Sequence, residues 1–237
     1  MDFNWGEFII CLRSGLGYLD VTVKLTLISL LIGLVFGFLI ATARHYKIPV
    51  LSGFLKCFVE IYQGIPFMVS LLFYNIFFIL CFDDICDALN LSIRAKDVDR
   101  VFIGYFALAL LATIAISETL RGAYMAVDKV QFEAGASVGL TESQVLRRIV
   151  IPQMIPAAIP GLINNAVAII KGTSLVTAIG LVEVLNGSVI PCSKTYRYME
   201  GYIAAAAIYW VFTLLIEYAG HLLERHAKIF RKGRSTT

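Results

Sequence analysis

The sequence has little charge and few of the side chains that usually carry chemistry. Only 16% of its 237 residues are charged, and it holds three histidines and five cysteines, none of them in a CxxC pair. Because metal centres in proteins are mostly built from clustered Cys and His, no metal site is expected. The net charge of +3 is too small to indicate a nucleic-acid partner.

Two motifs of hydrolytic enzymes are also missing. The sequence contains neither GxxxxGK[ST], the loop that cradles nucleotide phosphates, nor the zinc-binding HExxH. The chain cannot itself be an ATPase, so we assign no catalytic residue and expect no cofactor in it. Any work on a solute must draw on a gradient or on a partner protein.

Long apolar stretches are what the sequence does contain. Its hydrophobic fraction is 59% and its mean hydropathy is +0.79, whereas soluble domains have roughly 45–50% apolar residues. We expect an all-α polytopic membrane protein with spans at about 20–43, 54–82, 101–120, 149–171 and 201–222. The apolar segment from Gly172 to Val182 is too short to cross, and is expected to be re-entrant or a broken helix.

The distribution of basic residues predicts the orientation. With the N-terminus outside, twelve Lys and Arg lie at cytoplasmic ends and six at outer ends, which fits the positive-inside rule for five crossings. The cytoplasmic set is Arg44, Lys47, Lys56, Arg121, Lys129, Arg147, Arg148, Arg225, Lys228, Arg231, Lys232 and Arg234. The basic tail, residues 227–237, is therefore expected in the cytoplasm.

Two further features are expected on the outer side. Residues 1–17 carry apolar side chains near helical spacing and predict a helix that lies on the membrane interface. Cys81 and Cys86 flank two aspartates at the end of the second span. They form either a disulfide or apolar packing.

A polar loop, residues 127–148, interrupts the apolar spans. Asp128 with Gln131, and Thr141 with Gln144, each pair a capping oxygen with a Gln three residues later that can reach back. Gly139 lies where the first helix needs a left-handed residue at its C-terminal end. The loop is therefore predicted to form two short helices that meet at an angle.

The first of these helices is predicted to dock onto another protein. Glu133 stands beside Ala134, Gly135 and Ala136, so one anionic side chain adjoins residues small enough for a second backbone to approach closely. An amphipathic helix at the lipid headgroups would instead prefer Lys and Arg opposite bulky apolar residues.

The same segment resembles the EAA loop of ABC importer permeases. That pattern is EAA, three residues, Gly, nine residues and then IxLP, and here Glu133-Ala134-Gly135 is followed at the same spacing by Gly139 and by Ile149-Val150-Ile151-Pro152. Gly135 replaces the third-position Ala, and Ile151 replaces Leu. In that family the loop is the coupling helix, which sits in a cleft of the ATP-binding subunit.

The resemblance extends from about Tyr18 to His226 and favours the branch for polar amino acids. Residues 58–66, FVEIYQGIP, are similar to its ExxRGTP segment, and residues 118–122, ETLRG, to its ExxRG. Residues 171–175, KGTSL, and 179–183, IGLVE, are similar to K[DE][TS][SA]L and the following IGLxE. Gln63 replaces the usual Arg and Gly172 replaces an acid, so substrate charge cannot be inferred from those positions.

The resemblance implies a type I ABC importer transmembrane domain over residues 18–226. It implies a bacterial inner-membrane permease with two copies of an ABC ATPase, which binds ATP and Mg, a second permease subunit, identical or homologous, and an extracytoplasmic solute-binding protein. The substrate would be a polar amino acid. Glu133, Ala134, Gly135, Ala136 and Gly139 would contact the ATPase.

Candidate residues of the solute pathway are ionisable or polar groups in or near the apolar spans. Charged groups there are costly, roughly 2.5–3.5 kcal/mol each on insertion scales, so their presence needs a reason. The candidates are Glu60, Gln63, Asn75, Glu118, Lys171, Thr173, Ser174 and Glu183. A structural role is open as well: solvation at the cytoplasmic surface for Glu60 and Glu118, and an ion pair with Glu183 or another acid for Lys171. Asn164 and Asn165, in the middle of the fourth span, form either helix-to-helix hydrogen bonds or walls of the pathway.

Two other classes of function remain open from sequence. One is a gradient-driven carrier or small channel whose cytoplasmic loop binds another protein, and the other is a membrane anchor in a complex that transports nothing. Secondary carriers usually show an internal repeat of their spans, and none is evident here. Uptake that needs ATP and survives an uncoupler would separate the importer from both.

Overall fold

The computed structural model describes residues 3–234, with side chains described through Arg225, and these residues form helices joined by turns. The helices are α1 (Trp5–Leu16), α2 (Leu19–His45), α3 (Leu51–Gly64), α4 (Phe67–Ala88), α5 (Val101–Met125), α6 (Lys129–Ser137), α7 (Glu142–Val145), α8 (Ile151–Gly172), α9 (Val184–Val189), α10 (Cys192–Thr195) and α11 (Tyr198–Arg234). Short 3₁₀ segments lie at Ala95–Asp97 and Thr173–Ile179, and a π-helical turn at Leu146–Val150 joins α7 to α8.

Five helical segments within the described chain are long and apolar enough to cross a membrane, which confirms the all-α fold with five spans. They are Leu19–His45, Phe67–Ala88, Val101–Met125, Glu142–Ile179 and Tyr198–Arg225. The apolar segment after Gly172 forms a 3₁₀ helix that ends at Gly180, whose φ of +81° is left-handed. It is a break at the end of the fourth span rather than a sixth crossing.

The second span differs in its start from the expected 54–82. The chain breaks at Ile65 and Pro66, both extended, so that α3 and α4 are separate helices. Pro66 cannot donate a backbone hydrogen bond, and its ring disfavours helical geometry in the residue before it. Only α4 is long enough to cross the membrane, and α3 is a short helix before it.

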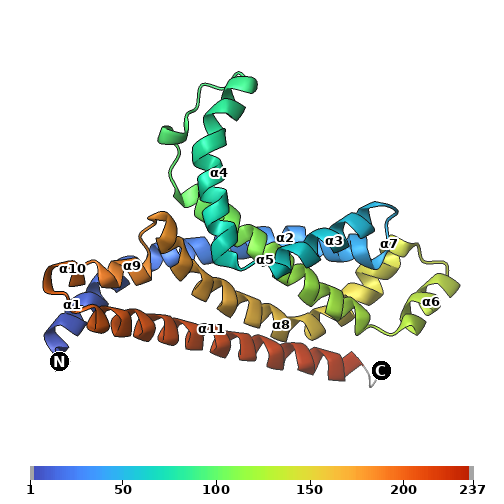
Figure 1. The fold of residues 1–237 in the computed structure, drawn as a ribbon. Coiled ribbons are helices and arrows are strands. Elements are labelled where there is room, and N and C mark those ends of the chain that lie inside the picture. Colours follow the sequence, from blue (N-terminus) through green and yellow to red (C-terminus); the bar gives the residue numbers. More distant parts are fainter. Residues whose placement is uncertain (1–2, 235–237) are drawn as a thin grey trace.

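The long helices lie side by side in an elongated bundle (Figure 1). α5 packs on both α2 and α8, and α11 packs on α8. At one end of the bundle α1 packs against α9 and α11, and at the opposite end lie α6 and α7. α4 stands away from this bundle, and only 17% of its most apolar window is buried within the chain.

Glycines allow α2 and α5 to approach closely. A Cβ on Gly33 would lie 2.7 Å from the Cβ of Ala112, and one on Gly37 would lie 3.0 Å from the carbonyl oxygen of Thr113. Gly33 and Gly37 are four residues apart on one face of α2, the spacing that brings membrane helices into backbone contact. This contact fixes the centre of the bundle.

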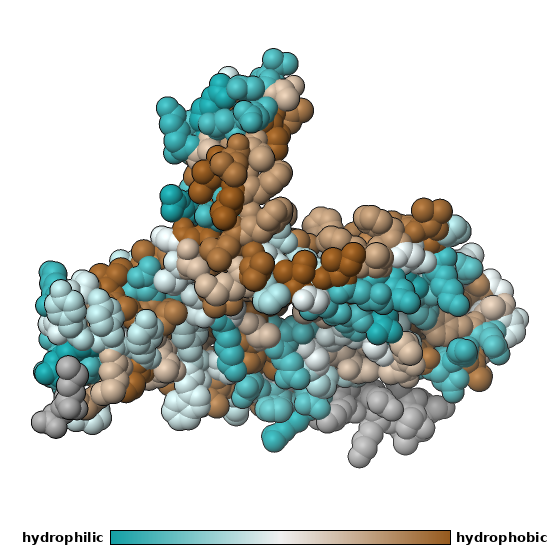
Figure 2. Space-filling view, in the orientation of Figure 1, coloured by the Kyte–Doolittle hydropathy of each residue, from teal (hydrophilic) through white to brown (hydrophobic). Residues whose placement is uncertain are grey.

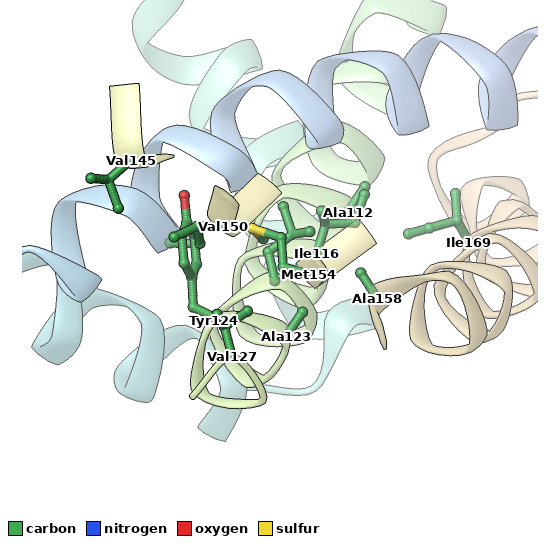
Figure 3. Packing of buried hydrophobic residues seen from close by; sticks show 12 residues of the cluster. Ala112, Ile116, Ala123, Tyr124, Val127, Val145, Val150, Met154, Ala158 and Ile169 are labelled. Atoms are coloured by element: carbon green, nitrogen blue, oxygen red, sulfur yellow. The ribbon is translucent and has the colours of Figure 1, made fainter. Parts of the chain in front are cut away.

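The main core cluster joins the bundle to the polar loop. It contains Ala112, Ile116, Ala123 and Tyr124 from α5, Val145 from α7, Val150 from the π turn, and Met154, Ala158 and Ile169 from α8 (Figure 3). Since these residues come from both sides of the loop, the loop and the spans share one packed core.

Apolar side chains cover α4 outside the bundle, while polar side chains gather at its far end (Figure 2). Phe73, Phe77 and Leu80 on this helix are each about half exposed or more. In a membrane protein such a surface faces lipid or another subunit.

The two chain ends agree in part with expectation. The predicted helix within residues 1–17 is α1, whose N-terminus is capped by Asn4. α1 packs on α9 and α11, so part of its apolar face is buried in protein. Of the predicted tail, 227–234 continue α11, and 235–237 lie outside the described residues.

Candidate functional site

The polar loop folds into two short capped helices. The Asp128 carboxylate accepts a hydrogen bond from the backbone N–H of Val130 at 3.0 Å and so caps α6. Thr141 and Gln144 form a reciprocal capping box at the start of α7, with the Thr141 N–H donating to Gln144 Oε1 at 2.9 Å. Gln131 does not reach back to Asp128, because its side-chain oxygen accepts a hydrogen bond from Gln153 Nε2 at 3.2 Å.

Gly139 turns the chain between these helices. Its φ is +77°, a conformation that glycine adopts without the steric cost that other residues carry. The Leu140 N–H donates to the Gly135 carbonyl and the Gly139 N–H donates to the Ala136 carbonyl, at 3.1 and 3.0 Å. This pair of bonds is the Schellman motif that ends helices.

The small residues of α6 do not all face outward. Glu133, Ala134 and Ala136 are exposed, whereas Gly135 is buried. A Cβ on Gly135 would lie 2.7 Å from Val145 Cγ2 and 3.0 Å from Ile149 Cδ1. Gly135 therefore lets α6 pack against α7 and the π turn, while Glu133 and Ala134 remain available to a partner.

Aromatic stacking ties the loop to the spans. The His45 ring at the end of α2 stacks on Tyr124 of α5, with centroids 4.5 Å apart, and on Phe132 of α6, with centroids 5.4 Å apart. The hydroxyls of Thr42 and Tyr124 are within hydrogen-bond distance, 2.8 Å. α6 is thus in direct contact with the end of α2 and, through His45, with α5.

Prolines shape the junction between the loop and α8. Pro152 lies in the first turn of α8, and Pro156 and Pro160 lie inside it. Each lacks the N–H that would bond four residues back, so the preceding turn is loosened. The π turn at Leu146–Val150 occurs at this point, as is common where a helix carries a functional bend.

Residues 135–139, GASVG, also match the hydrolase pattern GxSxG. In hydrolases that serine sits on a sharp turn between a strand and a helix. Here Ser137 ends α6, and its hydroxyl donates to the Glu133 carbonyl at 2.7 Å. The pattern is therefore part of the helix end and not a nucleophile.

A polar cavity of about 480 Å³ lies near the loop end of the bundle, between α2, α3 and α5. It brings together three of the predicted pathway residues, Glu60, Gln63 and Glu118. Sequence reasoning did not assign the other residues of its lining to the pathway: Arg44, Lys47, Ser52, Gly53, Lys56 and Arg121. The signal for the basic ones was present, since all four belong to the cytoplasmic positive set.

Charges in this cavity are unequally paired. Glu118 accepts hydrogen bonds from the guanidinium of Arg44 and from Arg121 Nε, the latter at 2.9 Å. Glu60 has a looser contact with Lys56, 3.8 Å between charged atoms, with both side chains mostly exposed. Glu118 is therefore held by two cations, whereas Glu60 is the carboxylate more open to a solute.

Glu183 lies in a separate, closed cluster. It is fully buried, and its carboxylate accepts hydrogen bonds from the hydroxyls of Tyr209, Thr22 and Thr177 and from the N–H of Leu185, where it caps α9. The alternative that Glu183 pairs with Lys171 is not what this geometry shows. Its partners lie on α2, α11 and the 3₁₀ segment, so the buried carboxylate links three parts of the bundle.

The remaining predicted pathway residues are dispersed. Thr173 is buried, and its hydroxyl donates to the Ile170 carbonyl at 2.7 Å, while the Ser174 hydroxyl donates to the Lys171 carbonyl at 2.7 Å. The side chain of Lys171 is exposed. Asn75 lies on α4, and its buried Oδ1 has no hydrogen-bond partner among the described residues.

Asn165 makes a helix-to-helix hydrogen bond, which is one of the two roles that the sequence left open for it. Its Nδ2 donates to Thr119 Oγ1 of α5 at 2.8 Å. Gly161, one turn earlier on α8, lies so close to Thr119 that an added Cβ would be 2.6 Å from its methyl group. Asn165 therefore fixes α8 against α5.

The fold and the loop together define a class: a helical membrane protein with five spans and a polar loop that packs on those spans. Residues 33–229 match the family described as binding-protein-dependent transport system inner membrane component. The chain is 31% identical to the L-cystine transport system permease protein TcyL of Bacillus subtilis, over 94% of this chain and 90% of that protein. It is also 31% identical to the histidine/lysine/arginine/ornithine transport system permease protein HisQ of Salmonella typhimurium, over 88% and 91%.

A solved structure agrees with these relatives. The crystal structure of an amino acid ABC transporter with histidines matches with a TM-score of 0.79 and 28% identity, covering 95% of this chain and all of that one. The chain belongs to the binding-protein-dependent transport inner-membrane components, as a permease subunit of an ABC amino-acid importer. It is a multi-pass inner-membrane protein, and ATP hydrolysis lies in the partner ATPase.

Proposed function

We propose that this permease pairs with a second, identical or homologous permease, and that two ATPase subunits and an extracytoplasmic binding protein complete an importer for a polar amino acid. The exposed, weakly packed α4 supports the pairing, because one chain leaves most of this helix uncovered. The relatives named for cystine and for histidine, lysine, arginine and ornithine support the substrate class.

The α6–α7 loop is the contact with the ATPase in this proposal. Its outward face presents Glu133 and Ala134. Its inward face packs on α7 and the π turn at Gly135, and is joined to the spans by the stack of Phe132 on His45 and of His45 on Tyr124. Because the inward face of this loop is packed on the rest of the chain, a partner that moves the exposed outward face also moves the helices that form the pathway. This geometry is the observation that carries the proposal.

Orientation follows from the same contact. The ATPase works on cytoplasmic ATP, so α6 and α7 lie on the cytoplasmic side, and α1, α9 and α10, at the opposite end of the bundle, lie outside (Figure 1). The polar cavity then opens toward the cytoplasm. The positive residues Arg44, Lys47, Lys56 and Arg121 that line it lie on the side that the positive-inside rule requires.

The cavity is the proposed cytoplasmic part of the solute pathway. An amino-acid zwitterion needs an acid for its ammonium group and a cation for its carboxylate. Glu60, with its loose contact to Lys56, offers the first, and Lys47 offers the second. Lys171 and Ser174 at the break of the fourth span are the proposed contacts deeper in the membrane.

The docking proposal is tested by charge reversal. Glu133→Arg should release the ATPase during purification while the permease stays folded, because an exposed anionic contact becomes repulsive. Asp84→Arg, the same change at an exposed position of α4, should retain the ATPase and serves as the matched control. Full, substrate-stimulated ATPase activity in the co-purified Glu133→Arg complex would show that this residue does not dock.

The pathway proposal is tested by removing charge. Glu60→Gln, or Lys171→Ala, should abolish uptake into membrane vesicles while the ATPase remains attached. Asp84→Asn is the control for loss of an exposed acid. If uptake by Glu60→Gln and Lys171→Ala is normal, both residues have structural roles only. Thermal stabilisation of the partner binding protein by a panel of amino acids would identify the substrate.

A further inference from the structure

Two cysteines far apart in sequence meet inside the protein. Cys11 of α1 and Cys192 of α10 are both fully buried, and their sulfurs are 3.4 Å apart. The other three cysteines, Cys57, Cys81 and Cys86, are all on α3 or α4. Cys81 and Cys86 are five positions apart on one helix, beyond the reach of a disulfide, so the expected alternative that they pair is wrong.

The surroundings hold the two thiols in place. The Asn4 N–H donates to Glu200 Oε1 at 3.1 Å, and the Ser14 hydroxyl donates to the Gly187 carbonyl at 2.6 Å, so both ends of α1 are fixed to the elements around Cys192. Gly201 of α11 comes so close that an added Cβ would lie 2.5 Å from the Cys192 sulfur. Small rotations of two side chains, by about 1.4 Å in total, would bring the sulfurs to bonding distance.

The pair lies at the end of the bundle opposite α6 and α7 (Figure 1). With the orientation proposed above, on which this inference rests, that end faces the extracytoplasmic space. Thiols there meet an oxidising environment, whereas cytoplasmic thiols are kept reduced.

We propose that Cys11 and Cys192 form a disulfide that ties α1 to α10 and the start of α11. A thiolate of one cysteine attacks the reactive disulfide of an extracytoplasmic thiol–disulfide oxidant, giving a mixed disulfide. The second cysteine then displaces the oxidant. One S–S bond forms in the permease, its two thiols lose two protons and two electrons, and the oxidant's disulfide is reduced to two thiols.

The bond forms during folding, before α1 has packed. In the packed state burial raises the pKa of the Cys11 thiol to about 12, so almost no thiolate is present at neutral pH. The same burial protects the finished bond from reductants. The bridge closes a loop of more than half of the chain and holds the outer ends of α1 and α11 together while the cytoplasmic ends move.

The test is a count of free thiols in the assembled importer in its native membrane. Membranes are quenched in acid, denatured and treated with a maleimide–polyethylene-glycol tag, with and without prior reduction. Wild type should carry three tags without reduction and five after it, since two of the five cysteines are bridged. Five tags without reduction would overturn the proposal.

Variants identify the pair. Cys11→Ser should carry four tags with or without reduction, because Cys192 is left free, and Cys192→Ala should behave in the same way. Cys57→Ser, the control at an exposed cysteine, should carry two tags before reduction and four after it. A Cys11→Ser protein that still gains two tags on reduction would show that the bridge joins other cysteines. The wild-type count stands even if a variant fails to fold.

A separate measurement tests the orientation. A membrane-impermeant maleimide applied to intact spheroplasts should label Lys96→Cys, near the far end of α4, and should not label Ser143→Cys in α7; both positions are exposed. Reversed labelling would overturn the proposed orientation. Correct labelling with five free thiols would overturn the disulfide alone.

Discussion

Gly135 lies on the face of α6 that packs against α7 and the π turn. The space beside its Cα is already filled by the side chains of Val145 and Ile149. The residue therefore acts within the permease, although the EAA pattern alone suggested a contact with the ATPase. Glu133 and Ala134, two positions and one position earlier, are exposed. Neighbouring residues of one motif thus lie on opposite faces of α6, Gly135 toward the rest of the chain and Glu133 and Ala134 toward the outside.

Gly135→Ala should destabilise the loop. Its methyl group would lie within 2.7 Å of Val145, and overpacking of this kind costs about 1–3 kcal/mol. Thermal unfolding of the purified complex should begin several degrees lower, with earlier loss of the ATPase. Gly122→Ala, at a helical position with nothing within 4 Å, should be neutral or stabilising. Equal unfolding temperatures for both variants would contradict the packing argument.

Glu183 provides a second prediction at a single residue. Glu183→Leu should unfold at lower temperature, since it leaves the buried donors of Tyr209, Thr22 and Leu185 without an acceptor, at about 1–3 kcal/mol each. Glu183→Gln keeps an acceptor and should retain most of the stability and the uptake. Stable Glu183→Gln protein with no uptake would instead make Glu183 a contact of the solute.

At the scale of helices, α5 is the element that contributes both to the contact with the polar loop and to the lining of the polar cavity. Its C-terminal half carries Tyr124, which stacks on His45, and Glu118, which lies in the polar cavity. These residues are less than two helical turns apart. A shift of α5 that follows the loop would therefore move the wall of the cavity as well.

Tyr124→Ala tests this connection. It removes a fully buried ring and the stack that joins α2, α5 and α6, and such truncations cost about 3–5 kcal/mol. The ATPase should still bind, because Glu133 is unchanged, but its stimulation by loaded binding protein should fall severalfold. Phe106→Ala, an aromatic truncation on the same helix at a site 58% exposed, should keep the stimulation. Equal stimulation in the two variants would show that the stack does not transmit motion.

Contacts between residues close together in the chain could be predicted from sequence, whereas contacts between residues far apart in the chain could not. The Thr141–Gln144 capping box and the turn at Gly139 involve neighbours in the chain, so local patterns predicted them. Gln131 instead meets Gln153, and Glu183 meets Thr22 161 positions away, and no local pattern encodes such contacts. The five spans were predictable from hydrophobicity, whereas the outward or inward direction of Gly135 was not.

At the scale of the whole molecule, the ends of the bundle are structurally separate. α1, α9 and α10 gather at one end, and α6 and α7 gather at the other (Figure 1). The main core lies toward the loop end, and Cys11, Cys192 and Ala204 form a small cluster of their own. The two ends can therefore be altered independently.

Removal of α1 tests that separation. A chain that begins at Gly17 should still retain the ATPase, because the α6–α7 end is unchanged. Its unfolding temperature should be several degrees lower, because the surface of α9 and α11 that α1 covers becomes exposed. Loss of the ATPase from a truncated permease that remains folded would show that the ends are coupled more tightly than their packing indicates.

The α6–α7 loop has one face packed on this chain and one face exposed, and this division bears on how importers diverge in evolution. Residues on its inward face, such as Gly135, are constrained by this chain's own core, whereas Glu133 and Ala134 are exposed and, in the docking proposed above, are constrained only by the ATPase. Substitutions outside can then accumulate without disturbing the permease fold. A permease built in this way can exchange one ATPase for another over evolutionary time, so that several importers in one cell can come to share a single motor subunit.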